Sequence, residues 1–285
     1  MLMQLPRHLH TLLLFTWTDY KTIFLPITAF ACATAPLHSA SRLLQAWSWI
    51  WLHQLMCNVS NQARSKEEDV LNRPWRPLPS GRVSEAAAVR LRHLTVLVCL
   101  LHSYMCGWDM VAVTAGLMLT TYFYDNVGLA SHHLGKSLCN IGGYTAFEIG
   151  ATKLVGDTRA LDHISWIAVV ISGTLIFTTV HTQDFPDVEG DAKLGRVTFP
   201  IYAPETARLF TICAMVIWSL FLCWFWKVDT GVSTAMFALG LFVGLRFYWW
   251  RTPEHDARSY LIYNIWLMLA HLLPVKGRMQ GTNID

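Results

Sequence analysis

Two clusters of acidic residues stand out in a chain that is otherwise rich in apolar stretches. The first runs from Asn61 to Asp69 and leads into a basic, proline-rich stretch that ends at Arg82, and the second runs from Asp184 to Arg196. Carboxylates are costly near a bilayer, so a cluster of them beside apolar segments usually serves a function. Carboxylate oxygens suit Mg²⁺, which proteins commonly bind together with the phosphates of a substrate. The clusters therefore predict a membrane enzyme that binds a diphosphate.

The spacing within each cluster predicts shared helix faces. Asn61, Ser65 and Asp69 lie four residues apart, and the aspartates from Asp184 to Asp191 lie three and four residues apart. Residues at such separations are neighbours on a helix surface. Two carboxylate faces on one side of a helical bundle could hold Mg²⁺ ions between them. The ions would bind diphosphate oxygens and stabilise the charge that develops as the diphosphate leaves.

Basic residues frame both clusters and could help to neutralise a diphosphate. The candidates are Arg73, Arg76, Arg82, Lys136, Lys193 and Arg196. A single acidic run such as that of residues 66–69 is most often a solvated helix end, and basic residues often only set membrane topology or meet lipid headgroups. The occurrence of two framed clusters next to long apolar segments favours a site over these simpler explanations.

The composition indicates an integral membrane protein. Of the 285 residues, 53% are hydrophobic and 14% are charged, whereas a soluble domain has about 25% charged residues. The net charge of +3 gives no indication of nucleic-acid binding. The seven cysteines are scattered and form no CxxC pair, so we expect free thiols and no zinc site. His132 and His133 lack a second cluster of ligands.

Apolar stretches long enough to cross a bilayer recur along the whole chain. A spanning helix needs about 20 mostly apolar residues. The expected spans are roughly residues 20–37, 43–60, 88–106, 109–125, 137–155, 162–181, 206–226, 231–248 and 258–274. We therefore expect one domain, residues 1–285, that is an all-α membrane bundle of about nine helices. Residues 9–19 are expected to form a surface helix, and residues 107–109 a tight hairpin.

The charged loops predict the orientation of this bundle. Four expected spans separate the two acidic clusters, so both should emerge on the same side of the membrane. Twelve Lys and Arg residues fall in the loops of that side, and six fall in those of the opposite side. The positive-inside rule then places the clusters and the N-terminus in the cytoplasm. Asp19 and Lys21 interrupt the first apolar run, which argues against a cleaved signal peptide.

The residues of both clusters resemble the motifs of the UbiA superfamily of intramembrane prenyltransferases. The first family motif, Asn-x-x-x-Asp-x-x-x-Asp, resembles Asn61 to Asp69, and the Asn-Arg-Pro-Trp-Arg-Pro stretch from Asn72 is similar to what often follows it. The second family motif, Asp-x-x-Asp-x-x-x-Asp with a following Gly-Arg-x-Thr-x-Pro, resembles Asp184 to Pro200. The resemblance covers nearly the whole chain, in the order and at the separation that the family shows.

The resemblance implies a nine-helix bundle around a central cavity, in which Mg²⁺ and both motifs hold the diphosphate of a prenyl donor. It implies that the catalytic residues are Asp69, Asp184 and Asp187. The implied metal ligands are Asn61, Glu68, Asp69, Asp184, Asp187 and Asp191. The implied diphosphate-binding residues are Arg73, Arg76, Lys136, Lys193 and Arg196.

Three features depart from the family pattern. Ser65 stands where the family usually has Asp, and because a hydroxyl is a weaker Mg²⁺ ligand than a carboxylate, Glu68 is expected to help complete the first metal site. Pro186 lies inside the second motif and should break the helix or begin a new turn. The Tyr-x-x-x-Lys pattern of some members is absent, and Tyr124 and Lys136 are among the nearest residues to it.

The form of the first motif is similar to a fungal branch of the superfamily that includes membrane-bound terpene cyclases. The resemblance therefore implies a cyclase that ionises farnesyl diphosphate and closes the cation on its own double bonds. A prenyltransferase that uses an aromatic acceptor is the alternative. An ion-coupled transporter is a remote one, because the acids and bases cluster at one membrane face rather than along the spans. A fungal source would imply the endoplasmic reticulum membrane, whereas prenyl chain length, product, oligomeric state and the cavity-lining aromatic residues stay open.

Overall fold

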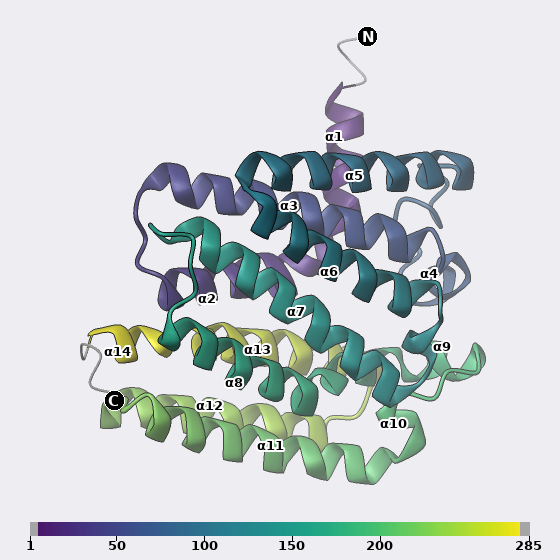
Figure 1. Ribbon diagram of the computed structural model, residues 1–285. Helices are drawn as coiled ribbons and strands as arrows, with labels where there is room; N and C mark the ends of the chain where they lie inside the picture. The colour runs from purple at the N-terminus through teal and green to yellow at the C-terminus, as the bar shows by residue number, and fades with distance from the viewer. Residues whose placement is uncertain (1–4, 280–285) are drawn as a thin grey trace.

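The protein folds into a bundle of helices that lie side by side (Figure 1). This computed structural model describes residues 5–279. The long helices are α3 (Ala40–Gln62), α5 (Glu85–Cys106), α6 (Trp108–Asp125), α7 (His133–Val155), α8 (His163–Thr179), α11 (Pro204–Phe225), α12 (Thr230–Trp249) and α13 (Pro253–Leu272). The described residues contain no named strand, and an isolated β-bridge joins His132 to Val197.

Shorter elements precede, connect and follow the long helices. At the N-terminus they are α1 (Leu5–Thr16), the 3₁₀ turn η2 (Trp17–Asp19), the π-helical turn η3 (Tyr20–Phe24) and α2 (Leu25–Thr34). The others are α4 (Lys66–Asn72), η4 (Leu129–Ser131), the 3₁₀ segment η5 (Val180–Asp187), α9 (Val188–Lys193), α10 (Phe199–Tyr202) and α14 (Pro274–Met279). The expected first span is thus a π-helical turn followed by a short helix, and the expected surface helix corresponds to α1 and η2.

Polar side chains fix where several helices begin. Each accepts a hydrogen bond from a backbone N–H of the first helical turn, which satisfies a donor that the helix itself leaves free. These capping residues are Ser39, Ser84, Asp162, Asp229 and Thr252. α5 and α6 are joined through Gly107 alone, whose φ of 135° is accessible to glycine and strained for other residues. The tight hairpin expected at this position is confirmed.

Four stretches in the described part of the chain are long and apolar enough to cross a membrane. They are Glu85–Cys106, His163–Lys193, Pro204–Phe225 and Thr230–Trp249. Large apolar side chains of α5, such as Leu94, Leu97 and Leu101, are exposed on the surface, as expected for a helix face in contact with lipid. The nine crossings expected from the sequence stay a prediction.

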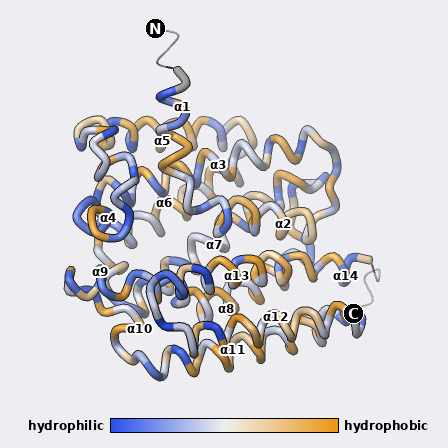
Figure 2. The backbone as a smooth tube through the Cα atoms, turned by 180° about the vertical axis from the view of Figure 1, so that it is seen from behind, coloured by the Kyte–Doolittle hydropathy of each residue, from blue (hydrophilic) through white to orange (hydrophobic). Residues whose placement is uncertain are grey.

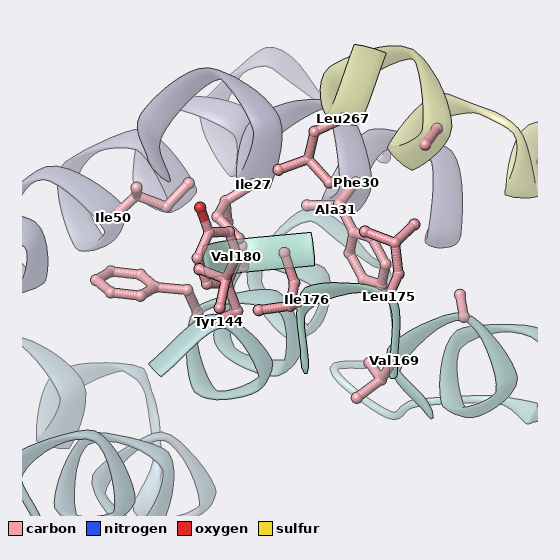
Figure 3. Packing of buried hydrophobic residues seen from close by; sticks show 14 of the residues in the cluster. Ile27, Phe30, Ala31, Ile50, Tyr144, Val169, Leu175, Ile176, Val180 and Leu267 are labelled. Atoms are coloured by element: carbon pink, nitrogen blue, oxygen red, sulfur yellow. The ribbon is translucent and has the colours of Figure 1, made fainter. Parts of the chain in front are cut away.

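α2 lies among the other helices of the bundle and packs against both α7 and α13. Figure 3 shows its buried side chains in contact with those of neighbouring helices. They include Ile27, Phe30 and Ala31 of α2, Ile50 of α3, Tyr144 of α7, Leu175 and Ile176 of α8, and Leu267 of α13. This packing holds the N-terminal segment, and with it η3, in a fixed position beside α7 and α13.

The polar connecting elements gather at one end of the bundle. Figure 2 shows hydrophilic stretches around α4 and α9, whereas hydrophobic residues dominate much of the long helices. α4 and α9 are in direct contact. A Cβ atom added to Gly190 of α9 would clash with the side-chain amide of Asn72 on α4, so a larger residue there would force Asn72 or α4 to move. The two acidic clusters therefore lie at the same end of the bundle.

Candidate active site

The chain turns within the first acidic cluster. α3 ends at Gln62 and α4 begins at Lys66, so the expectation that Asn61, Ser65 and Asp69 share the face of one helix is wrong. The Ser65 hydroxyl donates to the backbone oxygen of Asn61 over 3.0 Å. Serine hydroxyls commonly offer the backbone such an alternative to continued helix. Asn61 stays at the end of α3, whereas Asp69 lies on the following helix and is fully buried.

The second acidic cluster is also divided between two elements. Asp184 and Asp187 belong to η5 and Asp191 belongs to α9, so these residues do not share the face of one α-helix as expected. Pro186 lies inside η5, just before the change of helix type. Because proline cannot donate a backbone hydrogen bond, it favours such a break. The helical path continues through Pro186 to Lys193, so the expected break takes the form of a change from 3₁₀ to α geometry just after it.

Ion pairs connect the two clusters to each other. Arg73 Nη2 lies 2.6 Å from Asp187 Oδ2. Arg196 Nη2 lies 2.7 Å from Glu68 Oε2, and its Nη1 lies 3.4 Å from Asp191 Oδ1. In the two shorter pairs, the cation comes from one cluster and the carboxylate from the other. The structure thus joins residues more than a hundred positions apart, such as Arg73 and Asp187, into one polar site.

Two further ion pairs hold one buried carboxylate of each cluster. Lys136 Nζ, from the first turn of α7, lies 2.5 Å from Asp184 Oδ1. Arg76 Nη1 lies 2.7 Å from Asp69 Oδ1. Breaking such a pair by removing one partner is strongly destabilising, because the other charge is left uncompensated. Each of these basic residues was predicted to bind diphosphate, and each is found on a predicted metal ligand.

Burial and the ion pairs shift the pKa values of Asp69 on α4 and of Arg73 just after it. Burial raises the pKa of Asp69, although Arg76 and Arg73 act in the opposite direction. Burial by itself would lower the pKa of Arg73, but the neighbouring carboxylates of Asp187 and Glu68 outweigh it and raise the pKa. Arg73 therefore stays charged, and the carboxylate of Asp69 would gain from a further cation beside it.

A cavity of about 640 Å³ lies at this junction, with residues of both clusters in its wall. The predicted residues that line it are Asn61, Glu68, Arg73, Arg76, Lys136, Asp184, Asp187 and Arg196. Asp69 and Asp191 are buried outside this lining, and each has an Oδ2 atom without a hydrogen-bond partner in the protein. Lys193 is exposed at the end of α9 and does not line the cavity.

Several residues of the cavity wall were not predicted. Asp19 and Lys21 enter it from the N-terminal turns, and Lys21 Nζ lies 5.4 Å from the ring centre of Tyr260. Asp125, at the end of α6, accepts a hydrogen bond from the Asn61 amide over 2.9 Å. The charges of Asp19 and Lys21 within an apolar run were the available signal, because ionisable residues in membrane segments usually face a polar interior.

Away from the clusters, the cavity wall combines apolar and aromatic side chains with polar ones such as Asn58, Thr120 and Asn140. The aromatic residues that line it are Trp75, Tyr124, Tyr144, Phe147 and Tyr260. The Tyr144 hydroxyl donates to the backbone oxygen of Thr22 over 2.8 Å, which anchors its ring. Tyr124 and Lys136 both reach the cavity, although the Tyr-x-x-x-Lys spacing is absent. The sequence could not select these rings among 13 Trp, 14 Phe and 9 Tyr, because aromatic residues also gather at membrane interfaces.

The donor atoms at the site suit a hard cation, although they do not converge on one point. Within residues 5–279, no group of three or more His, Cys, Asp or Glu side chains forms a ready metal position. Mg²⁺ usually takes one or two carboxylates and completes its shell with water and phosphate oxygens. Glu68 and Asp187 at the wall and the unpartnered Oδ2 atoms of Asp69 and Asp191 match that requirement. The residues therefore fit Mg²⁺ in type when a diphosphate supplies further ligands.

Sequence comparison finds relatives along nearly the whole chain. A profile of the UbiA prenyltransferase family matches residues 23–268. The chain is 29% identical to the fumagillin beta-trans-bergamotene synthase of Aspergillus fumigatus, over 96% of this chain and 94% of that protein. It is 28% identical to the somaliensene A/B synthase of Streptomyces somaliensis, over 93% and 91% of the two chains. The polyprenyl transferase eriF of Hericium erinaceus is 28% identical over 70% of each chain.

Solved structures share the fold of this chain. A UbiA homolog from Archaeoglobus fulgidus bound to GPP and Mg²⁺ matches with a TM-score of 0.63 at 12% identity, over 92% of this chain and 99% of that chain. The apo structure of a UbiA homolog from Aeropyrum pernix K1 matches with a TM-score of 0.66 at 15% identity, over 90% and 95% of the two chains. At these identities the likeness concerns the fold alone, and it confirms the expected all-α bundle.

Proposed function

Since this chain belongs to the UbiA prenyltransferase family, we propose that it is a Mg²⁺-dependent terpene cyclase that acts on farnesyl diphosphate within a membrane. The observation that carries the proposal is the cavity, whose wall holds carboxylates and cations of both clusters at one end and aromatic rings elsewhere. Such a cavity can hold both parts of a prenyl diphosphate, a charged head group and an apolar tail. Members of the family are enzymes, so the ion-coupled transporter gains no support.

In this proposal the basic residues of the cavity wall bind the diphosphate. Arg73, Arg76, Lys136 and Arg196 line the cavity, and each is paired with a carboxylate. Basic side chains form charge-assisted hydrogen bonds with phosphate as they do with carboxylate. These four side chains can therefore turn to phosphate oxygens when a diphosphate enters. Lys193 is not part of the proposed set, because it is exposed outside the cavity.

The carboxylates that lose their basic partners in this exchange would hold Mg²⁺. The proposed ligands are Asn61, Glu68, Asp69, Asp184, Asp187 and Asp191, of which Asp69, Asp184 and Asp187 are the proposed catalytic residues. Bound Mg²⁺ supplies positive charge to the diphosphate as it leaves. A buried carboxylate whose cation has turned away is costly, so metal and diphosphate should enter together. A solved homolog of the same fold is bound to GPP and Mg²⁺, which supports this assignment.

The chemistry then follows from the two ends of the cavity. The carbon–oxygen bond of the substrate breaks with its electron pair on the diphosphate, which the basic side chains retain. The allylic cation that remains lies among rings such as Tyr144 and Phe147, whose faces attract positive charge. An apolar wall also keeps water from capturing the cation early. A double bond of the same chain attacks the cation, and transfer of a proton from the cyclised cation to the retained diphosphate completes a cyclic hydrocarbon.

The relatives favour cyclisation over transfer to an acceptor. Two relatives that match more than nine-tenths of both chains are named as a bergamotene synthase and a somaliensene synthase. The polyprenyl transferase of Hericium erinaceus matches a smaller share, 70% of each chain. An aromatic prenyltransferase is therefore the second candidate, with the same head-group site and a different nucleophile.

Membranes that contain the expressed chain test the proposal. They would receive farnesyl diphosphate and Mg²⁺ without an aromatic acceptor, and extracts would be examined by gas chromatography–mass spectrometry, with Asp184→Ala as the control. A cyclic hydrocarbon or alcohol that the control lacks would support the cyclase. A prenylated adduct that forms only after phenolic acceptors are added would establish the prenyltransferase. Other prenyl chain lengths would be supplied in parallel, because the substrate length is part of the proposal.

The same reasoning gives the proposed location. We propose a multi-pass membrane protein whose acidic clusters face the cytoplasm, because most loop lysines and arginines lie on their side of the expected spans. A diphosphate head group is soluble in water and would enter from that side. The similarity to a fungal synthase favours the endoplasmic reticulum membrane.

A further inference from the structure

Gln54 is a buried polar residue in a part of the cavity wall that the proposed chemistry has not yet used. It lies on α3 with 1% of its surface exposed, and its side chain lines the cavity. Its Nε2 atom donates to the backbone oxygen of Thr16 over 3.0 Å. Its Oε1 atom has no hydrogen-bond partner in the protein.

The hydrogen bond to Thr16 settles which way the amide of Gln54 points. A backbone oxygen can only accept, so the nitrogen of the amide must face it. The carbonyl oxygen of Gln54 is therefore directed away from Thr16. Most buried polar atoms in proteins have a partner, and an exception calls for an explanation. Because Gln54 lines the cavity, a molecule held in that cavity would lie beside its side chain.

The position of Gln54 places this oxygen away from the diphosphate end. Asn61 of the first cluster lies on the same helix, and seven residues of helix correspond to about 10 Å. The cavity residues of neighbouring helices include Leu117, Tyr144 and Phe147. Gln54 thus adds an electron-rich atom to a part of the wall in which these apolar and aromatic side chains lie beside polar ones such as Asn58 and Thr22.

We propose that the carbonyl oxygen of Gln54 stabilises positive charge on the isoprenoid chain after the diphosphate has left, and that it thereby helps to determine the product. The inference rests on the proposed ionisation of a prenyl diphosphate. Gln54 serves as a specificity-determining residue because it favours those cationic intermediates whose charge lies near its oxygen. A glutamine is a much weaker base than a carboxylate, so it can stabilise the cation without ending the reaction by removing a proton.

The burial of Gln54 strengthens this effect. An interaction between a charge and a fixed dipole is much stronger in a dry interior than in water. The dipole is also held in place before the reaction, because the Thr16 oxygen fixes the amide. Tyr144 and Phe147 would surround the same cation with ring faces. The rings stabilise the charge over a broad region, whereas the single oxygen of Gln54 favours one position.

Gln62 offers a matched control on the same helix. It also has 1% of its surface exposed, donates its Nε2 to a backbone oxygen of the N-terminal segment, that of Phe15, over 2.9 Å, and leaves Oε1 without a partner. It does not line the cavity. Gln54→Met and Gln62→Met remove the same groups, so a difference between them reports on the cavity. Gln54→Asn serves as a second variant that keeps an amide and withdraws its oxygen.

The first test measures the binding of a stable mimic of the cation. The probe is a farnesyl-like amine with a protonated tertiary nitrogen at an inner position, compared with its neutral hydrocarbon counterpart, both in the presence of Mg²⁺ and pyrophosphate. Calorimetry on purified protein in detergent would give the affinities. We expect Gln54→Met and Gln54→Asn to weaken amine binding by about tenfold, as for loss of a hydrogen-bonding partner of a charged group. The affinity of each variant for the hydrocarbon should stay within about twofold of that of the unchanged chain. The affinity of Gln62→Met for the amine should also stay within about twofold.

The second test compares product composition at equal conversion of farnesyl diphosphate. Gln54→Met should shift the products toward less cyclised compounds, and Gln62→Met should not. Equal affinity for the amine in the Gln54 variants and the unchanged chain would overturn the proposal. A loss of amine affinity in Gln62→Met as large as that in Gln54→Met would overturn it as well. If the unchanged chain converts no prenyl diphosphate, the proposed function fails, but the amine-binding comparison still decides the role of Gln54.

Discussion

At the scale of single residues, the site consists of acids and bases that hold each other and can exchange partners. Asp184 has 3% of its surface exposed and pairs with Lys136. Removing its charge would take away a proposed Mg²⁺ ligand and would leave Lys136 uncompensated. We expect Asp184→Asn to reduce turnover by about a hundredfold or more, the cost typical of losing one electrostatic group at a polar site. Turnover would be measured as the rate at which purified protein releases pyrophosphate.

Asp229→Asn is the control for this substitution. Asp229 is exposed, caps α12, pairs with Lys276 and does not line the cavity. Asparagine also serves as a helix N-cap, and exposed ion pairs contribute little to stability. Turnover should therefore stay within about twofold of the unchanged chain. An Asp184→Asn variant as active as Asp229→Asn would contradict the assignment of Asp184.

The sequence identified the charged residues of the two motifs better than the rest of the cavity wall. Residue type and spacing were enough to select Arg73 and Asp187, because both stand in motifs that resemble a family. Their contact depends on how α4 packs on α9, which no local pattern encodes. The sequence did not indicate a role for Gln54, because the sequence around a glutamine in an apolar segment does not show whether it faces a cavity or another helix.

At the scale of elements, the close contact between α4 and α9 holds the two clusters in register. A Cβ atom at Gly190 would overlap the Asn72 side chain. We expect Gly190→Ala to push α4 away and to cost about 1–3 kcal/mol, as overpacking of a tight contact typically does. Turnover should fall with stability, because Arg73 and Glu68 reach the second cluster from this segment. Thermal unfolding and pyrophosphate release would be measured together.

Two companion variants decide whether the clash at Gly190 causes the loss of stability expected for Gly190→Ala. Gly116 of α6 has no atom within 4 Å of an added Cβ, so Gly116→Ala should leave stability unchanged or raise it slightly. Asn72→Ala in the Gly190→Ala background shortens the side chain that the new methyl group meets, and it should recover part of the lost stability. A Gly190→Ala variant as stable as Gly116→Ala would show that α4 and α9 can shift without cost.

An ion pair between Arg208 of α11 and Asp256 of α13 supports the second acidic cluster through Phe185. Arg208 binds both carboxylate oxygens of Asp256, at 3.0 and 2.9 Å, and its guanidinium lies 4.4 Å from the ring centre of Phe185, next to Asp184. Arg208→Met would leave Asp256 buried without its partner. We expect a loss of about 3–5 kcal/mol in the free energy of unfolding. Arg208→Met combined with Asp256→Leu should recover most of it, and a double variant as unstable as the single one would show that the charges are not coupled.

The long helices were predictable because each needs only a run of apolar residues and a capping signal. The hairpin at Gly107 and the break at Pro186 followed from residues with special backbone preferences. The shared helix faces of the acidic motifs were not found, because both motifs lie where one helix ends and the next begins. Spacing rules hold only while the helix continues. The π-helical turn at Tyr20–Phe24, which carries Lys21 into the cavity, likewise has no sequence signature.

At the scale of the whole molecule, the bundle separates an exterior with many apolar side chains from a junction rich in opposite charges. Stretches such as Pro204–Phe225 and Thr230–Trp249 can be recognised from composition, since a membrane requires length and hydropathy. The junction forms only when segments from residues 18 to 260 meet. Its four basic residues from the clusters and α7 are each paired with a carboxylate, which makes the binding of an anion and of a cation depend on each other.

This dependence predicts that Mg²⁺ and pyrophosphate stabilise the fold together. Pyrophosphate alone would draw Arg73 and Lys136 away from Asp187 and Asp184 and leave these carboxylates uncompensated. Mg²⁺ alone would compete with the same cations for the carboxylates. With both present, each new charge meets an opposite one, and at a ligand concentration about a hundredfold above Kd the free energy of unfolding should rise by about 2.7 kcal/mol. Unfolding temperatures in detergent would be compared for each addition alone, for both, and for both with EDTA. Equal stabilisation by pyrophosphate with and without Mg²⁺ would contradict the exchange of partners, because the arginines would then bind phosphate without a metal to replace them on the carboxylates.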